Sequence, residues 1–313
     1  MSYVKDFTWN KDMTAGELAG SLGSVGFQGT ELAKAAAIVE KMKETGAKVF
    51  LTFTSNMVTS GLRGFFAQLI ELGVADAVVT TVGSVEEDIM RASGEQFAIG
   101  SFAANDFALH EEGTNRVGNL YISNKSYEKF EAAMGTTLAA LYAHKKTWTV
   151  SEMLREIGLT LSDPHSILHH AAKHNVPVFC PAITDGAFGF HLFMFQQDHK
   201  DFMVDVVRDF QHILECTSHD EKKGIICLGG GVSKHYAIFT CLLNGGFDYA
   251  VYLTTSQQYA GSLSGATTSE AKSWGKIKDD SDAATVIGDV TITFPLVMVK
   301  ALEELAAKGL LRQ

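Results

Sequence analysis

The sequence has few of the residues that divide a chain or cross-link it. Its 313 residues include four prolines and four cysteines, with no Cys-x-x-Cys pair and no linker rich in proline, glycine and serine. Each cysteine lies in or beside an apolar stretch, so we expect reduced, buried thiols in a cytoplasmic protein. We expect one large domain over residues 1–313, in which residues 1–45 form a mainly helical N-terminal segment.

Long apolar runs and positive charge are also scarce. No apolar run reaches the roughly 18 residues of a membrane-spanning helix, and residues 1–14 lack the apolar core of a signal peptide. The 26 Lys and Arg residues stand against 36 Asp and Glu, a net charge of −10, so we expect neither nucleic acid nor a membrane as a partner. Apolar residues make up 46% of the chain, which supplies a sizeable core and excludes disorder.

The dominant pattern is a short apolar run, a turn of small residues and then a helical stretch. Five such runs have the character of buried strands, at residues 48–54, 77–81, 176–180, 224–228 and 249–253. Strands that alternate with helices predict an α/β fold, with a Rossmann-like parallel sheet and helices on both faces.

Small polar residues follow nearly all of these strands. In parallel sheets ligands bind at the carboxyl ends of the strands, where such residues and free backbone N–H groups suit phosphates and ribose hydroxyls. The alternative is ordinary turn chemistry, because the same residues make turns anyway.

Motifs for common nucleotide and hydrolase sites are missing: there is no Walker loop, no GxSxG, no HExxH and no Rossmann GxGxxG. The glycine-rich turn 229–231 is by itself a weak dinucleotide signal. Lys234 and His235 follow it at the start of a helical stretch. A helix N-terminus disfavours the cationic imidazole there, so His235 is a candidate general base.

Three polar clusters each allow a structural and a functional interpretation. Residues 86–88 are three carboxylates, which either complement a helix dipole or anchor an amine or a ribose hydroxyl. Residues 165–174 hold four histidines at metal-like spacing, but no Cys or carboxylate completes either pair, so we expect a solvated helix and no metal. Residues 269–278 combine a tryptophan with three lysines, which form either a solvated basic patch or a cation cage whose lysines lower one another's pKa.

Several rare strings run in order from about Asp12 to about Leu302. They are Gly26–Gly29, Phe53–Asn56 with Ser60–Gly61, Thr80–Gly83 with Val85–Asp88, Asn115–Leu120, Pro177–Phe179 with Pro181–Gly186, Leu228–His235, Asp248–Tyr252 and Glu270–Ile277. Together they resemble the strings of the deoxyhypusine synthase family, over nearly the whole chain.

The resemblance implies an NAD-dependent transferase. In this family a Rossmann-type subunit forms a homotetramer, and NAD oxidises spermidine to an imine. A lysine of the enzyme accepts the aminobutyl group and passes it to an acceptor amine. The acceptor of the namesake enzyme is a lysine of translation initiation factor 5A, whereas relatives use putrescine and make homospermidine.

The matching strings also imply the site residues. Lys276 is expected to be the covalent nucleophile, with its pKa lowered by burial and positive charge, and His235 to take protons from the substrate amine. NAD contacts are implied for Ser55, Asn56, Met57, Val58, Thr59, Thr81, Val82, Gly83, Glu87, Asp185, Gly230, Thr255, Asp289 and Val290. Substrate contacts are implied for Glu86, Glu87, Phe190, His235, Ala260, Leu263, Glu270 and Trp274.

Three of these positions depart from the family pattern. The family holds the distal ammonium groups of the polyamine with aspartates, and this chain has Phe190, Ala260 and Leu263 in their place. A desolvated ammonium without a carboxylate costs several kcal/mol. We therefore expect spermidine to bind poorly while the chemistry at Lys276 is kept.

Three functions remain in competition. The main interpretation is an NAD-dependent aminoalkyl transferase that acts on a small-molecule amine or polyamine, similar to homospermidine synthase. The first alternative is a true deoxyhypusine synthase that modifies the factor, with its charge anchors displaced to residues such as Glu86 or Glu270. The second is a non-catalytic NAD-binding partner subunit, against which the presence of Lys276 argues.

Overall fold

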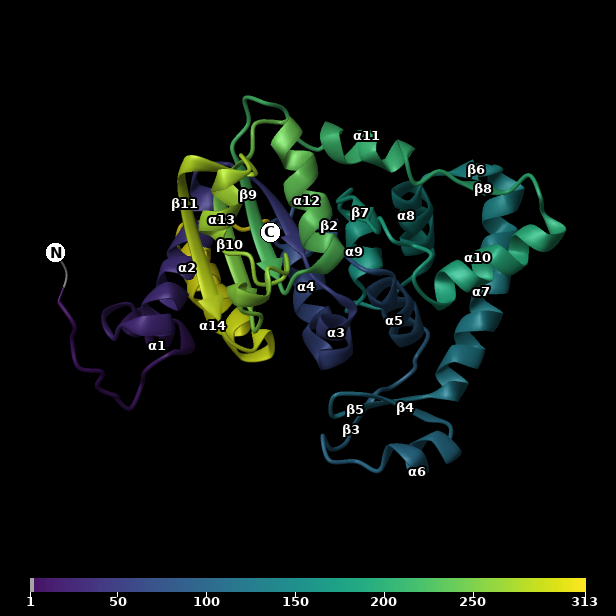
Figure 1. The fold of residues 1–313 in the computed structure, drawn as a ribbon, viewed down its shortest axis with the longest axis horizontal. Coiled ribbons are helices and arrows are strands. Elements are labelled where there is room, and N and C mark those ends of the chain that lie inside the picture. The colour runs from purple at the N-terminus through teal and green to yellow at the C-terminus, as the bar shows by residue number, and fades with distance from the viewer. Residues whose placement is uncertain (1–2) are drawn as a thin grey trace. The chain divides into compact units, whose positions relative to one another are not determined.

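The computed structural model describes residues 3–313, which fall into two compact units (Figure 1). The first unit contains residues 3–53, 72–79 and 211–313. The second contains residues 54–71 and 80–210, and α11 (Arg208–Glu215) spans the point where the chain returns to the first unit. Within the described residues no helix is both long enough and apolar enough to cross a membrane.

The first unit is built around parallel strands. They are β1 (Lys48–Thr52), β2 (Ala77–Val79), β9 (Lys223–Leu228), β10 (Phe247–Thr254) and β11 (Ile277–Ile287). Their order is β11-β10-β9-β1-β2, and Ile226 of β9 lies opposite Leu51 and Val251 of its two neighbours. β2, β9 and β10 are buried along their whole length, because continuous apolar runs suit a sheet with both faces covered.

Helices cover this sheet on both faces. α2 (Phe27–Glu44) and α14 (Val290–Ala307) pack against β10, and so does α12 (Gly231–Leu243). Tyr249 and Tyr252 of β10 are an odd number of residues apart, so they point to opposite faces. The ring of Tyr249 lies 5.9 Å from Nζ of Lys41 on α2, and that of Tyr252 lies 4.1 Å from Nζ of Lys234 on α12. The predicted parallel α/β sheet with helices on both faces is confirmed.

The strand order reverses between β1 and β9. The chain passes from β1 to β2 on one side, while β9 lies on the other side of β1. In open α/β sheets, ligands bind outside the carboxyl ends of the strands at such a reversal. The glycine turn 229–231 follows β9 at this point. Shorter helices complete the unit, namely α1 (Ala15–Ser21), η1 (Leu22–Ser24), η3 (Gln258–Ala260) and α13 (Thr268–Ser273).

The second unit is mainly helical. Its helices are α3 (Ser55–Met57), η2 (Val58–Leu62), α4 (Arg63–Glu71), α5 (Val82–Ala92), α6 (Asp106–Glu111), α7 (Asn124–His144), α8 (Val150–Thr160), α9 (Ile167–Lys173) and α10 (Ala187–Asp198). Its strands are β3 (Ala98–Ile99), β4 (Thr114–Val117), β5 (Leu120–Ser123), β6 (Thr147–Trp148), β7 (Val178–Phe179) and β8 (Met203–Val204). Gly61 has φ +95°, a conformation that favours glycine, and it kinks the chain between α3 and α4.

Three sequence expectations need correction. The edge strand β11 was not expected. The expected solvated helix is α9, and its His170 is buried together with four apolar neighbours because α9 packs against α4 and α8. All four cysteines are free thiols as expected, but Cys216 is only partly buried.

Candidate active site

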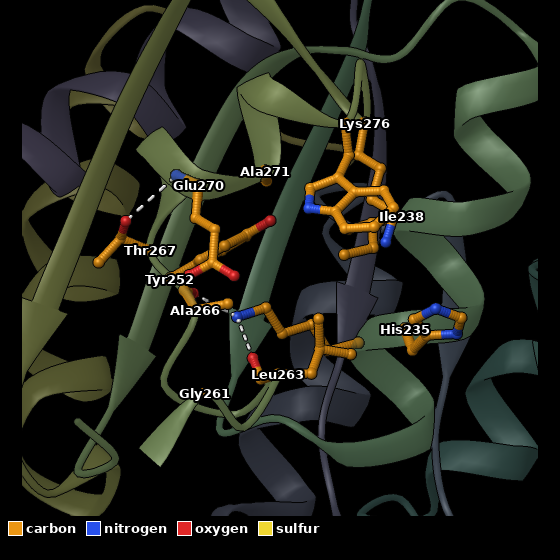
Figure 2. Close-up of a pocket in the computed structure, with 12 residues that line it drawn as sticks. His235, Ile238, Tyr252, Gly261, Leu263, Ala266, Thr267, Glu270, Ala271 and Lys276 are labelled. Carbon is orange, nitrogen blue, oxygen red and sulfur yellow. Dashed lines mark hydrogen bonds between the residues drawn. The ribbon is translucent and has the colours of Figure 1, made fainter. Parts of the chain in front are cut away.

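A pocket of about 290 Å³ lies within the first unit. Its walls come from α12, β10, the loop 261–267, and α13 with the residues that follow it. Figure 2 shows Lys276, Glu270, Leu263 and His235 around it. The pocket therefore brings together the expected nucleophile, the expected base and three further expected substrate contacts, namely Leu263, Glu270 and Trp274.

Lys276 is placed by the way α13 ends. Trp274 is the C-cap of this helix, and Gly275 follows with φ +68°. The backbone N–H of Gly275 donates to the carbonyl of Lys272, and that of Lys276 donates to the carbonyl of Ala271. This is a Schellman motif, in which glycine takes the left-handed position without a Cβ penalty. The Trp-Gly-Lys sequence thus puts Lys276 at a fixed point, directly before β11.

The surroundings of Lys276 are aromatic and enclosed. The residue is 8% exposed, and its Nζ lies 5.2 Å from the ring centroid of the exposed Trp274. The two other lysines of the string lie outside the pocket lining. Nζ of Lys272 donates to the carbonyl of Asp279, and Lys278 pairs with Asp248 at 2.9 Å.

The cation beside the pocket is Lys234, to which the sequence analysis gave no role. It is 1% exposed, and its Nζ donates to the carbonyls of Leu263 (3.0 Å) and Ala266 (2.7 Å). Burial lowers its pKa, and the nearby Lys276 lowers it further. Lys234 therefore ties α12 to the loop that forms one wall of the pocket.

His235 lies on the exposed side of α12 and faces the same pocket. Partial burial lowers its pKa, and the positive charge of Lys276 adds to this effect. Both effects favour the neutral imidazole that a base requires. Its ring stacks on Phe239 at 5.7 Å.

Glu270 is the one carboxylate that lines the pocket within the described part of the chain. It sits in the first turn of α13, where its N–H donates to Oγ1 of Thr267. Leu263 adds apolar surface to the lining. Ala260, in η3, is exposed and outside the lining, although its neighbour Gly261 belongs to it.

The remaining first-unit residues expected to contact NAD follow strand ends. Gly230 precedes α12, and a Cβ at this position would lie 2.3 Å from Cα of Ser264. Only glycine therefore permits this close backbone approach. Thr255 is exposed after β10, and Asp289 caps α14, accepting a hydrogen bond from the N–H of Thr291 ahead of the buried Val290.

Four of the second-unit residues expected to contact NAD are linked by hydrogen bonds. The N–H of Ser55 donates to Oγ1 of Thr81, and Oγ1 of Thr59 donates to the Glu87 carboxylate at 2.7 Å. A Cβ on Gly83 would lie 2.8 Å from that of Ser55. The other second-unit residues expected to contact NAD are Asn56, the buried Met57, Val58 and Val82, and the exposed Asp185.

The carboxylates of residues 86–88 are buried rather than solvated. Glu86 accepts a hydrogen bond from the N–H of Phe188 at 2.8 Å, so it caps the start of α10. Asp88 accepts from Arg63 and from the first turn of α9. Phe190 lies on α10 and is 57% exposed.

Replacing Glu87 with glutamine is expected to stabilise the protein at pH 8 but not at pH 5. Burial raises the pKa of Glu87 from 4.5 to about 7, and the neighbouring Glu86 adds to the effect. The folded protein therefore holds the Glu87 proton more tightly than the unfolded chain does. The contribution of Glu87 to the free energy of unfolding is complete below pH 4.5 and is lost as the pH rises through 7. The total loss is about 3 kcal/mol.

Urea unfolding at the two pH values measures this effect. The exposed Glu111→Gln variant is the matched control and should keep the wild-type pH dependence. An unchanged pH dependence in Glu87→Gln would contradict the raised pKa.

This chain is similar to several known proteins that share one family name. A family model described as deoxyhypusine synthase matches residues 17–301. A relative from Thermoplasma acidophilum whose name contains deoxyhypusine synthase is 36% identical and aligns over 96% of this chain and 97% of its own. The relative so named from Eremothecium gossypii is 35% identical over 94% and 90% of the two chains. A solved structure from Entamoeba histolytica described by the same name has a TM-score of 0.68 and 26% identity, covering 96% and 97%.

Proposed function

Because this chain belongs to the deoxyhypusine synthase family, we propose that it transfers an aminobutyl group through Nζ of Lys276, with NAD as cofactor. The observation that carries the proposal is the enclosed Lys276 beside Trp274 and His235 in one pocket. An amine nucleophile, a neutral imidazole and an aromatic wall are the groups that amine transfer requires.

The residues present suit a dinucleotide. Thr81 is the N-cap of α5 in the second unit and makes no side-chain capping bond, so the first N–H groups of α5 are suited to an anionic phosphate. In the first unit Gly230 is the N-cap of α12, and the N–H of Gly231 already donates to Oγ of Ser264. A Cβ on Gly231, with φ +70°, would meet nothing within 4 Å, so the turn is open on that side. When bound, NAD accepts a hydride from the carbon beside the amine nitrogen and later returns it.

The chain's own residues perform the transfer. Trp274 orients the aliphatic part of the donor, and His235 takes the proton from its amine. Nζ of Lys276 forms a bond to the oxidised carbon while the bond from that carbon to the leaving amine breaks. The acceptor amine then displaces Lys276 from the same carbon, which restores the free lysine.

For the acceptor, we favour a protein lysine. The relatives are named for deoxyhypusine synthase, and the alignment with them covers nearly the whole chain. These names favour a deoxyhypusine synthase that modifies a protein lysine over an enzyme that, like homospermidine synthase, uses a small amine as acceptor. The homotetramer and the cytoplasmic location expected from the resemblance stay predictions.

A second candidate function is transfer between small-molecule amines. The observation in its favour is the apolar Leu263 in the pocket lining, because among the described residues Glu270 is the only carboxylate that lines this pocket. A donor with one ammonium group or an apolar tail fits this lining better than spermidine does.

Labelled spermidine tests the proposal directly. We expect the protein with NAD to transfer label to translation initiation factor 5A, but slowly. Transfer to free putrescine and not to the factor would favour the second candidate. Absence of transfer to any acceptor, over a panel of amine donors, would contradict both.

The variant Leu263→Asp is part of the same experiment. Restoring a carboxylate to the pocket wall is expected to raise kcat/KM for spermidine by about tenfold or more, because a charge-assisted bond contributes about 1.5–3 kcal/mol. Leu263→Asn has a similar volume without the charge and is the control. Equal rates in both variants would show that charge does not limit donor binding.

A further inference from the structure

A second cluster of chemically active side chains lies in the second unit. Glu71 ends α4, His170 lies within α9, and His174 is the C-cap of the same helix. One ligand atom from each lies within 4.8 Å of those from the other two. Within residues 3–313 this is the only group of three or more such side chains at this spacing.

Helix geometry and packing assemble the cluster. His170 and His174 are four residues apart, so both project from one face of α9. Their rings are nearly parallel, with centroids 6.0 Å apart. α4 packs against α9 (Figure 1), and this packing brings Glu71, at the end of α4, to the pair. The carboxylate comes from a helix 99 residues earlier in the chain, so the sequence expectation that none completes the pair is wrong.

The hydrogen bond of Nε2 orients the His170 ring so that Nδ1 can bind a metal ion. The residue is 4% exposed, and its Nε2 lies 2.9 Å from the carbonyl of Pro164. A carbonyl only accepts hydrogen bonds, so Nε2 carries the proton and Nδ1 presents a lone pair. Nδ1 is buried and has no hydrogen-bond partner. A buried acceptor left unpaired is costly, and a carbonyl on the far nitrogen is the usual support of a metal-binding histidine.

We propose that Glu71, His170 and His174 bind a zinc ion. Two imidazole nitrogens and one carboxylate oxygen are a zinc donor set, whereas Ca²⁺ and Mg²⁺ prefer oxygen ligands. Bonds of about 2.0–2.2 Å place donor atoms roughly 3.3 Å apart. Glu71 is exposed at a helix end, and the proposed binding requires its carboxylate to approach the two imidazoles.

One member of the cluster reaches an open pocket. Glu71 borders a pocket of about 510 Å³ in the second unit, to which Pro164, Arg91 and Gln68 also contribute, whereas His170 and His174 are not part of its lining. A zinc ion held by three protein ligands takes a water molecule as its fourth ligand. The bound ion ties the end of α4 to the end of α9. This site is independent of the transferase proposal.

Metal binding by the full chain is the test. Zn²⁺ is titrated against a chromophoric chelator, and Co²⁺ is added to look for the visible absorption of a tetrahedral complex. We expect one ion per chain, a Zn²⁺-dependent rise in Tm, and affinity at least about tenfold lower in His170→Gln, His174→Ala and Glu71→Gln. Glutamine at position 170 keeps a donor for the Pro164 carbonyl, so that variant is expected to fold.

His165→Ala is the matched control, because this exposed histidine belongs to the same segment but lies outside the cluster. It should bind Zn²⁺ as the wild type does. Equal Zn²⁺ affinity in the wild type and in His170→Gln, or loss of binding only in His165→Ala, would overturn the proposal. So would the absence of stoichiometric binding by the wild type.

Discussion

Replacement of Lys276 by alanine is expected to lower amine transfer by about 10⁴-fold or more, the scale seen when a covalent nucleophile is removed. The residue is enclosed, and its Nζ lies beside the Trp274 ring. The other lysine that lines the pocket, Lys234, has its Nζ bound to two carbonyls and does not replace it. Borohydride trapping followed by mass spectrometry measures the loss, because a lysine-bound aminobutyl imine becomes a stable adduct in the wild type.

Two variants make this result specific. Lys276→Arg keeps the positive charge but is never a neutral amine, so it should be as inactive as the alanine variant. Lys272→Ala, in the same string but outside the pocket lining, should trap the adduct as the wild type does. An adduct on another lysine, or full activity in Lys276→Ala, would refute the covalent role.

The largest effect on stability is expected from Asp88→Ala, at about 3–5 kcal/mol. Asp88 is 1% exposed and pairs with Arg63 at 2.5 Å. It also accepts hydrogen bonds from Oγ of Ser166 (2.9 Å) and from the N–H of Leu168 (2.8 Å), so it holds the start of α9. Its loss leaves a buried guanidinium with Asp163 as its remaining carboxylate partner.

Urea unfolding measures the difference. Asp106→Ala removes another aspartate that is paired with arginine, but on the surface, and should leave the unfolding midpoint close to the wild-type value. Similar midpoints for Asp88→Ala and the wild type would mean that the buried pair contributes no net stability.

The strands that the sequence predicts well are those that are buried. β1, β9 and β10 have continuous apolar runs, and their observed bounds are close to the expected ones. β11 escaped prediction because Asp279, Asp280 and Asp282 interrupt its pattern. An edge strand is half exposed, so its identity depends on pairing with β10 and on the contact of Asp282 with Lys41 of α2. Neither contact is local in sequence.

The site was predictable to the extent that it depends on rare strings. The family resemblance pointed to Lys276, His235 and Trp274, and these residues share one pocket. Lys234 gave no signal, because a lysine in a sequence suggests a solvated side chain and its burial depends on carbonyls about thirty residues away. The capping role of Glu86 depends on Phe188, more than a hundred residues later.

The loop that carries Leu263 is held by its main chain. Lys234 binds the carbonyl oxygens of Leu263 and Ala266, and every amino acid supplies such an oxygen. A mutation that exchanges the side chain at either position leaves this clamp in place. The main chain therefore anchors this wall of the pocket while its side chains form the lining, so substitutions at positions 263 and 266 can change the lining while Lys276 stays where it is.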